Sequence, residues 1–432
     1  MKKSVHKITL FIFSVILFFL QSGIKLFAND GPDSKEGVFK ESIKTIQITR
    51  EGWKLSYPII ELNGNVKLEI SFDDISDRVS NYNYKIIHCD FDWNPSPINE
   101  SDYIEGFRQN QFNNYAFSFN TYFKYVHYNL SLPNQDVNFL ISGNYLIEGY
   151  EDYDDTKLIF RKRFIITESK ANVVASIQRP VLSGYRDNSH EVNFNIEYRS
   201  FPIDNPYSDV KIAVLQNGRW DNSILNLKPL FNKAGVLEYN YQMENVFRGG
   251  NEYRWFEIKS MRYQSPYIKN IVYKGGYFHV YLFPEELKAN KQYFYEQDLN
   301  GKYYVEIQEG NNNDIDADYV YVYFTLPFNS PLPGGDFYVM GGLSEKVFSP
   351  SNKMIYNPDI EAYELTILLK QGYYNYRYEF LKTGTGSGDP TYTEGNHYET
   401  ENDYIILVYY HGNRSRYDRI IKYQIANSLK KN

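Results

Sequence analysis

The chain has 432 residues and a net charge of −7 at pH 7, from 53 acidic and 46 basic residues. Phosphate backbones repel an acidic chain, so we expect no nucleic-acid partner. The single cysteine, Cys89, excludes an intramolecular disulfide, and the fold must therefore be stabilised by packing.

The first residues have the layout of a secretory signal peptide. Three lysines precede an apolar run at residues 8–20, and a short polar stretch ends at Ala28. The run is shorter than the roughly 18 to 25 apolar residues of a spanning helix. We predict that residues 1–28 are cleaved after Ala28, which takes four lysines from the chain and lowers its charge from −7 to −11. The alternative is an uncleaved anchor, because Leu26 replaces the small residue usual before the cut.

Aromatic residues make up 18% of the chain, with 43 Tyr and 29 Phe but only four Trp. Such side chains favour strands. One interpretation is that tyrosines cover half-exposed sheet faces, with the ring packed and the hydroxyl hydrated. The other is that some of the rings form a binding surface, since Tyr is enriched at protein interfaces.

Short alternating segments recur along the chain and predict strands. In 192–198, alternation places Val192, Phe194, Ile196 and Tyr198 on one face. Similar segments lie at 67–72, 82–88, 125–132, 143–150, 158–166, 210–216, 319–326, 337–340 and 404–410. We find no stretch of ten residues with helical periodicity. The sequence therefore predicts an all-β fold of immunoglobulin-like sandwiches.

Turn and linker signals divide the predicted strands. Asn-Gly pairs at 63–64, 217–218 and 300–301 suit tight hairpins, because both residues tolerate positive φ. Two polar stretches, at 168–171 and 309–314, predict domain boundaries. We therefore expect three consecutive β-sandwich domains, an N-terminal one at 29–169, a middle one at 170–310 and a C-terminal one at 311–432.

Acidic residues alternate in the loop that begins at the end of the second linker, as calcium ligands often do. Asp314, Asp316 and Asp318 do not form an EF-hand, because Tyr319 and Thr325 stand where its glycine and final carboxylate belong. A solvated linker is the expected role, with a weak calcium site as the alternative. We predict no metal site.

Candidate catalytic residues lack the patterns that catalysis requires. Cys89 lies between His88 and Asp90, but a buried small hydrophobic residue is the commoner role for such a cysteine. Ser387 has no nucleophile elbow, and the remaining histidines show no zinc-ligand spacing. We therefore expect no enzyme activity, no catalytic residues and no cofactor.

The four tryptophans are the remaining candidates for recognition. Trp53, Trp93, Trp220 and Trp255 could stack on a pyranose ring together with neighbouring tyrosines, or could pack in the core. Of these, Trp93, Trp220 and Trp255 are our candidate partner-contact or core aromatics. A glycan-binding surface β-sandwich protein is therefore the alternative function.

Three segments of uncommon sequence occur in one order, at 84–93 (YKIIHCDFDW), 216–222 (QNGRWDN) and 394–404 (EGNHYETENDY). They resemble the type IX secretion system plug protein family, also described as DUF5103 domain proteins. The likeness continues at 119–122, 178–180, 260–265 and 370–376, so it covers essentially all of the chain after residue 28.

This resemblance implies a function in protein secretion by Bacteroidota. It implies a non-enzymatic periplasmic protein that plugs the giant outer-membrane translocon β-barrel of the type IX secretion system from its periplasmic side. That barrel would be the partner, and it would hold the plug at the outer membrane without a membrane span of its own. The strand predicted at 372–378 resembles those of early-set sandwiches, so an early-set-like fold is expected for the C-terminal domain.

Overall fold

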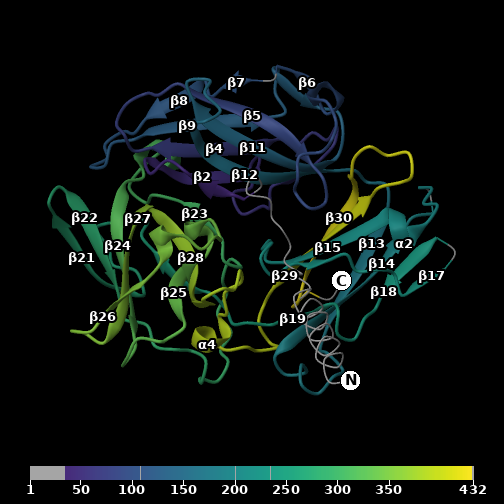
Figure 1. The fold of residues 1–432 in the computed structure, drawn as a ribbon. Coiled ribbons are helices and arrows are strands. Elements are labelled where there is room, and N and C mark those ends of the chain that lie inside the picture. Colours follow the sequence, from purple (N-terminus) through teal and green to yellow (C-terminus); the bar gives the residue numbers. More distant parts are fainter. Residues whose placement is uncertain (1–34, 108, 200, 234, 431–432) are drawn as a thin grey trace, which may run out of the picture. The chain divides into compact units, whose positions relative to one another are not determined.

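Strands dominate the described part of the chain, which comprises residues 35–107, 109–199, 201–233 and 235–430 of the computed structural model (Figure 1). The chain divides into two units, Met1–Lys35 and Glu36–Asn432, and the description below concerns the second. The predicted signal peptide and its cleavage after Ala28 lie outside the described residues. Where the chain is described, no helix is both long and apolar enough to cross a membrane.

The expected all-β sandwich fold is confirmed.

The first two sheets pack face to face and form the N-terminal sandwich. Alternation buries one face of each strand, as in β4, where Leu68, Ile70 and Phe72 are fully buried. One sheet has the order β1-β12-β11-β5-β7, with β3 beside β12: β1 (Gly37–Val38), β12 (Leu158–Thr167), β11 (Gly143–Glu151), β5 (Tyr82–Cys89), β7 (Asn110–Gln111) and β3 (Ile59–Glu61). The other has the order β2-β4-β9-β8: β2 (Ile43–Arg50), β4 (Leu68–Asp74), β9 (Val126–Leu132) and β8 (Asn114–Phe117). A short pair, β6 (Ile104–Gly106) and β10 (Val137–Phe139), completes this part.

The next two sheets form a sandwich that is discontinuous in sequence, which we call the split sandwich. One sheet contains β13 (Asn172–Gln178), β14 (Ser189–Glu197), β18 (Val236–Tyr239) and β17 (Phe231–Lys233), with β19 (Val246–Arg248) beside β14. The other has the order β16 (Ile224–Leu225), β15 (Val210–Gln216), β29 (Asp403–Tyr410) and β30 (Arg419–Asn427). The short helix α2 (Pro206–Asp209) precedes β15. Residues from both sheets share one apolar core.

The strands between β19 and β29 form a further sandwich, which we call the inserted sandwich. One layer is built on β28 (Gly372–Lys382), which pairs with β20 (Arg254–Glu257), β23 (Tyr303–Val305) and β25 (Gly335–Met340). The other has the order β21 (Ile268–Lys274), β22 (Tyr277–Leu282), β24 (Tyr319–Pro327), β27 (Ala362–Lys370) and β26 (Ile355–Asn357). Single helical turns at α3 (Asn313–Asp316) and α4 (Thr391–Glu394) lie in its connections.

The strands expected from alternation are confirmed. Each predicted segment coincides with an observed strand to within a few residues. Val192, Phe194 and Ile196 are buried in the core of the split sandwich, and Tyr198 packs against the same core. The Asn-Gly pairs at 217–218 and 300–301 have positive φ at both residues, as a tight turn requires.

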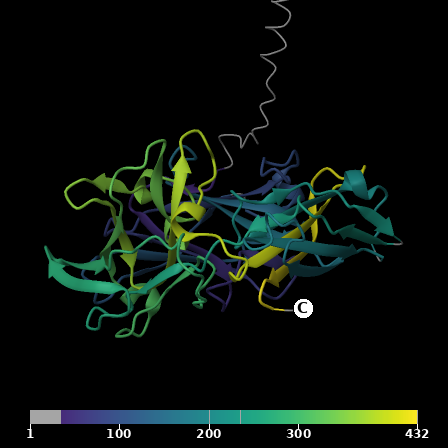
Figure 2. The same cartoon turned by 90° about the horizontal axis from the view of Figure 1, so that it is seen from below.

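Strand pairing groups the residues differently from three consecutive units. β29 pairs with β15 and β30 pairs with β29, so these C-terminal strands belong with residues 172–248 rather than with residues 311–402 (Figure 1; Figure 2). The physical reason is that β29 is apolar on both faces, with residues 404–409 all buried, and needs a layer on each side. A linker-like composition at 309–314 does not reveal which strands pair across it.

Candidate functional site

The N-terminal and split sandwiches meet through an apolar joint. The outward face of the sheet containing β11 and β12 contributes Leu146 and Ile165, and the outward face of the sheet containing β15 and β29 contributes Leu215 and Leu407. All four side chains are at most 5% exposed. Burial of two sheet faces against each other is the arrangement of a protein core. We define the apolar joint by this cluster: Tyr57, Ile59, Cys89, Phe91, Trp93, Leu146, Ile165, Ala213, Leu215, Ile405, Leu407, Tyr409 and Ile420.

Two of the candidate tryptophans lie at the edge of this joint. Trp93 is 4% exposed and contacts the half-buried Trp220 edge to face, with ring centroids 5.0 Å apart. The Arg163 guanidinium lies 4.4 Å from the Trp93 ring centroid and 5.5 Å from that of Trp220. Cation–π and aromatic contacts of this kind add to the stabilisation from burial. The structure thus brings Trp93 and Trp220 together, from different sandwiches.

The N-terminal and inserted sandwiches meet through a polar joint of different chemistry. Asp73 at the end of β4 forms an ion pair of 2.6 Å with Lys370 at the end of β27, and both side chains are 1% exposed. Asp73 also accepts hydrogen bonds from Tyr319, at 2.7 Å, and contacts Nδ1 of His127, its cross-strand neighbour on β9, at 2.7 Å. Thr45 contacts the Tyr319 hydroxyl at 2.6 Å. We call these five residues the ionic joint.

Charge pairing outweighs desolvation at the centre of the ionic joint. Burial alone would raise the pKa of Asp73, but the Lys370 ammonium and the hydrogen bond from His127 hold the pKa of this carboxyl below its usual value. Lys370 also donates to the carbonyl of Asp314 and lies 4.2 Å from the ring centroid of Tyr125. Asp73 is therefore ionised at neutral pH, and its stabilisation depends on Lys370.

The aspartates of the 314–318 segment support the ionic joint. Asp318 accepts the backbone N–H groups of Tyr122 and Phe123 at 2.7 and 2.9 Å. Asp316 accepts the N–H groups of 311 and 312 at 2.8 and 2.9 Å. Their carboxylates thus bind loop backbone rather than lie in a solvated linker as expected. Among the residues that the structure describes, no three His, Cys, Asp or Glu side chains gather as a metal site would require.

A third set of polar contacts joins the split and inserted sandwiches. Arg219, which follows β15, forms an ion pair of 3.2 Å with Glu379 on β28, and both side chains are buried. Lys346 donates to the carbonyl of Asn217 at 2.7 Å. Burial and the cations Lys302 and Arg219 lower the pKa of Lys346 to about 7. Each pair of sandwiches therefore has its own set of buried contacts.

Trp255 lies apart from the other two candidates, on the outward face of the inserted sandwich. It stacks on Tyr373 with centroids 5.3 Å apart, and Tyr373 stacks in turn on Tyr304 at 5.7 Å. The indole N–H donates to Glu296 at 2.6 Å, and Tyr267 meets the indole edge to face. Trp255, Tyr373 and Tyr304 thus form a row of stacked rings. The rings are partly exposed, so the row lies on the surface rather than in the core.

Exposed aromatic residues gather at the β8 edge of the N-terminal sandwich. Phe117 on β8 and Phe119 beyond it are 57% and 68% exposed. Tyr115 is 46% exposed, and Tyr122 is 55% exposed although its ring contacts Tyr273 of the inserted sandwich at 5.0 Å. Large apolar side chains left in solvent over one edge of a sheet indicate a protein-binding surface. We call Tyr115, Phe117, Phe119 and Tyr122 the β8 aromatic surface.

The catalytic candidates lack the environment of a reactive site. Cys89 is fully buried, and burial raises the pKa of its thiol to about 12, so the thiolate is not formed at neutral pH. His88 is 1% exposed, contacts Ser96 at 2.8 Å and has a pKa lowered by burial to about 4. The expected role of Cys89 as a small buried hydrophobic residue is confirmed.

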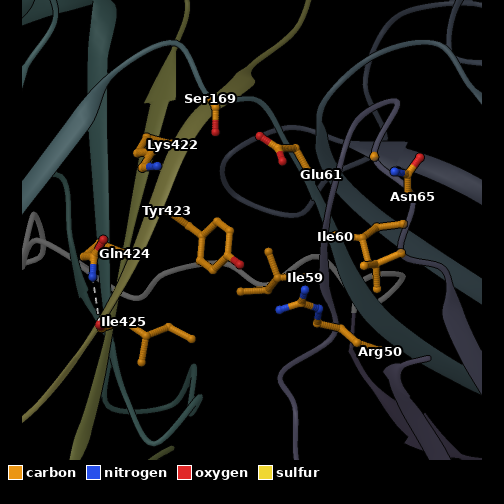
Figure 3. A pocket seen from close by; sticks show the side chains of 12 residues that line it. Arg50, Ile59, Ile60, Glu61, Asn65, Ser169, Lys422, Tyr423, Gln424 and Ile425 are labelled. Carbon is orange, nitrogen blue, oxygen red and sulfur yellow. Dashed lines mark hydrogen bonds between the residues drawn. The ribbon is translucent and has the colours of Figure 1, made fainter. Parts of the chain in front are cut away.

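A groove of about 410 Å³ lies where β30 passes β2 and β3 (Figure 3). Ile59, Tyr423 and Arg50 point into it from opposite walls, and Lys422 lies further along β30. The groove is lined by Arg50, Ile59, Ile60, Glu61, Gly64, Asn65, Val66, Ser169, Lys422, Tyr423, Gln424 and Ile425. Nothing in the sequence pattern indicated it, because its walls come from residues more than 350 positions apart.

Comparison with known proteins identifies the family. The family model for the first domain of the type 9 secretion system plug protein matches residues 43–168, which include most of the N-terminal sandwich. A crystal structure of a hypothetical protein from Parabacteroides merdae is similar with a TM-score of 0.88 and 36% sequence identity, over 91% of this chain and 98% of that chain. No curated protein matches the chain. The chain belongs to the type 9 secretion system plug protein family.

Proposed function

We propose that the protein is a non-enzymatic periplasmic plug, which binds and seals the periplasmic opening of the giant outer-membrane translocon barrel of the type IX secretion system. Family membership supports the link to secretion. The observation that carries the proposal is the apolar joint, because a plug must keep its shape against an open pore. Two sandwiches that share a buried core cannot separate without exposing that core to water.

The β8 aromatic surface is the proposed contact with the barrel. It lies on the sandwich that the family model matches, and its four rings remain exposed although neighbouring rings are buried. A stable protein interface buries roughly 1,200 Å² or more, with aromatic residues at its centre. Trp93 and Trp220 are too enclosed to supply this contact, and Trp255 could contribute from the inserted sandwich.

Affinity capture tests the proposal directly. The immobilised protein, with residues 1–28 removed, should retain a large outer-membrane β-barrel from a detergent extract of the source cells. The double variant F117S/F119S should reduce the retained barrel about tenfold or more, because loss of two central aromatic contacts costs at least about 1.4 kcal/mol. The matched control is Phe294→Ser, since Phe294 is 78% exposed and lies on the inserted sandwich. Recovery of no large barrel by the unmodified protein would refute the proposal.

Cell permeability tests the seal separately from binding. Cells that lack the protein should admit large antibiotics that the outer membrane normally excludes, and only when the translocon is present. The physical reason is that an open protein-conducting channel also passes small solutes. Equal permeability with and without the protein would leave binding possible but exclude sealing.

A glycan-binding role is the second candidate, and the row at Trp255 favours it. Trp255, Tyr373 and Tyr304 present partly exposed rings in line, and sugar rings stack on such surfaces. The test is a broad glycan array with Trp255→Ala as the comparison variant. Saturable binding that this substitution abolishes would support the glycan role, whereas no binding would remove it.

A further inference from the structure

We propose that the groove beside β30 binds an extended segment of a partner polypeptide, which adds as a strand to β30 and places a carboxylate side chain beside Arg50. This goes beyond the proposed function, because sealing a pore requires a surface but not a peptide site. It rests on three features of the groove: an unfinished strand edge, two cations without acidic partners, and an apolar floor.

The strand edge of β30 is only half covered. β29 occupies one side of β30, and no other strand pairs with it among the described residues. On the other side, the N–H groups of Glu168 and Lys170 donate to the carbonyls of Ile420 and Ile421 at 2.8 and 2.9 Å. Beyond Ile421 this cover ends, at the point where the groove begins. The remaining edge is therefore available for pairing.

Alternation shows which backbone groups face the groove. Along an antiparallel strand, every second residue directs its N–H and C=O away from the neighbouring strand. The carbonyl of Ile421 accepts from Lys170 on the outer side, and that of Ile425 accepts from the side chain of Gln424 at 2.9 Å. Tyr423 lies between them and faces the same way. In the described part of the chain its outward backbone groups have no hydrogen-bond partner, so an added strand would satisfy them.

The charges of the groove favour an acidic ligand. Arg50 and Lys422 line it against one acid, Glu61, and none of the three forms an ion pair within the described residues. The Arg50 Nε is shielded from solvent and has no hydrogen-bond partner there, although the guanidinium lies 5.8 Å from the Trp53 ring centroid. Figure 3 shows the Arg50 side chain directed into the groove, where the terminal N–H groups of its guanidinium can donate to a carboxylate.

The floor and the volume fit a peptide segment. Ile59 and Ile60 are each 3% exposed, and with the half-buried Tyr423 and Ile425 they give the groove an apolar base. Figure 3 shows Tyr423 and Ile59 approaching each other, with the Arg50 side chain next to Ile59. A volume of about 410 Å³ lies in the range of roughly 300 to 1,000 Å³ that is usual for ligand sites. Apolar side chains flanking the carboxylate would be buried here.

Fluorescence anisotropy with a designed peptide tests the proposal on the full chain without residues 1–28. The probe is fluorescein-labelled acetyl-Lys-Thr-Val-Glu-Val-Thr-Val-Lys-amide, which alternates apolar and polar residues around one glutamate. We expect saturable binding, and about tenfold weaker binding when Gln replaces the probe's glutamate or when Arg50→Gln is introduced. The matched control Lys228→Gln removes an exposed charge elsewhere on the split sandwich and should leave affinity unchanged.

Two further measurements separate strand addition from simple charge attraction. A probe with an N-methyl group on every residue has no backbone N–H to donate and should not bind. Hydrogen exchange at residues 422–427 should slow when the unmodified probe is present. The proposal would be overturned if the probe shows no saturable binding up to millimolar concentration, or if the methylated probe binds equally well. It would also be overturned if hydrogen exchange at 422–427 does not change, or if two copies of the protein pair through this edge and the probe does not displace them.

Discussion

The two joints of the N-terminal sandwich use opposite chemistry. Its joint with the split sandwich buries aliphatic and aromatic side chains from two sheet faces. Its joint with the inserted sandwich buries one ion pair, Asp73 with Lys370, inside a network of hydroxyl and imidazole groups. Apolar burial is non-directional and insensitive to salt, whereas a buried ion pair is directional and strongly destabilising when one partner is lost. The first joint therefore fixes two sandwiches as one body, and the second specifies how the third is held.

We propose that the sandwiches are also the domains, at 36–169, at 170–250 with 401–430, and at 251–400. The ends of the inserted part lie close together, because Thr400 donates to the carbonyl of Gly250 at 2.9 Å. This arrangement gives the largest expected effect. A chain that ends at residue 310 loses β29 and β30, and with them two of the four strands in one layer of the split sandwich and four residues of the apolar joint, Ile405, Leu407, Tyr409 and Ile420.

That truncated chain should not fold, whereas a chain in which a short Gly-Ser linker replaces residues 251–400 should. Circular dichroism and resistance to limited proteolysis distinguish the two outcomes. The excision removes Tyr319 and Lys370 from the ionic joint but leaves every residue of the apolar joint in place, so it tests which of the two joints the fold requires. A folded chain ending at residue 310 would contradict the proposed domains.

Within the ionic joint, Lys370→Met should destabilise the protein by about 4 kcal/mol, because it leaves the Asp73 carboxylate buried without a counter-charge. Calorimetric unfolding measures this change. The double variant Asp73→Asn with Lys370→Met should recover at least half of the loss, since it leaves no uncompensated charge. A cost for Lys370→Met below about 1 kcal/mol would show that the ion pair does not hold the joint.

In the apolar joint, Leu146→Ala should cost about 3 kcal/mol through lost burial and the cavity left behind. This cost should be the same at low and high salt, in contrast to substitutions that change only surface charge. The control is Leu230→Ala, because Leu230 is 39% exposed and its truncation should cost under about 0.5 kcal/mol. A strong salt dependence of the Leu146→Ala effect would contradict the contrast between the joints.

The smallest expected effect concerns pH at Asp298, a half-buried acid of the inserted sandwich. Burial raises the pKa of Asp298 to about 7, and the nearby acids Glu252 and Glu401 act in the same direction. An acid with a raised folded-state pKa binds more protons when folded, so its contribution to stability is present at pH 4 and is lost as pH rises through 7.

We therefore expect the melting temperature to fall between pH 5 and pH 8, and Asp298→Asn to reduce that fall by about 2 to 4 °C. The amide also loses one of the backbone hydrogen bonds that Asp298 accepts from Tyr253 and Asn300, so the variant should melt lower at every pH. The informative quantity is the slope of melting temperature against pH, compared between the unmodified protein and the variant. If Asp298→Asn leaves that slope unchanged, groups other than Asp298 cause the fall in melting temperature between pH 5 and pH 8.

Local pattern in the sequence was sufficient to predict the strands. Alternation around Val192, Phe194 and Ile196 identified one strand and its buried face, because side-chain direction in a strand reverses at every residue. The burial of Cys89 could be predicted for the same reason, since it ends an apolar strand. The family resemblance, carried by the segments at 84–93, 216–222 and 394–404, is likewise a property of the sequence.

Contacts between distant residues were decided by the tertiary structure alone. Asp73 and Lys370 are 297 positions apart, and neither position carries a local signal that it will be buried or paired. The same holds for the return of β29 to β15 and for the groove between β3 and β30. A strand's periodicity fixes which side chains share a face, but many partners can cover that face. The choice among them depends on the packing of the whole chain.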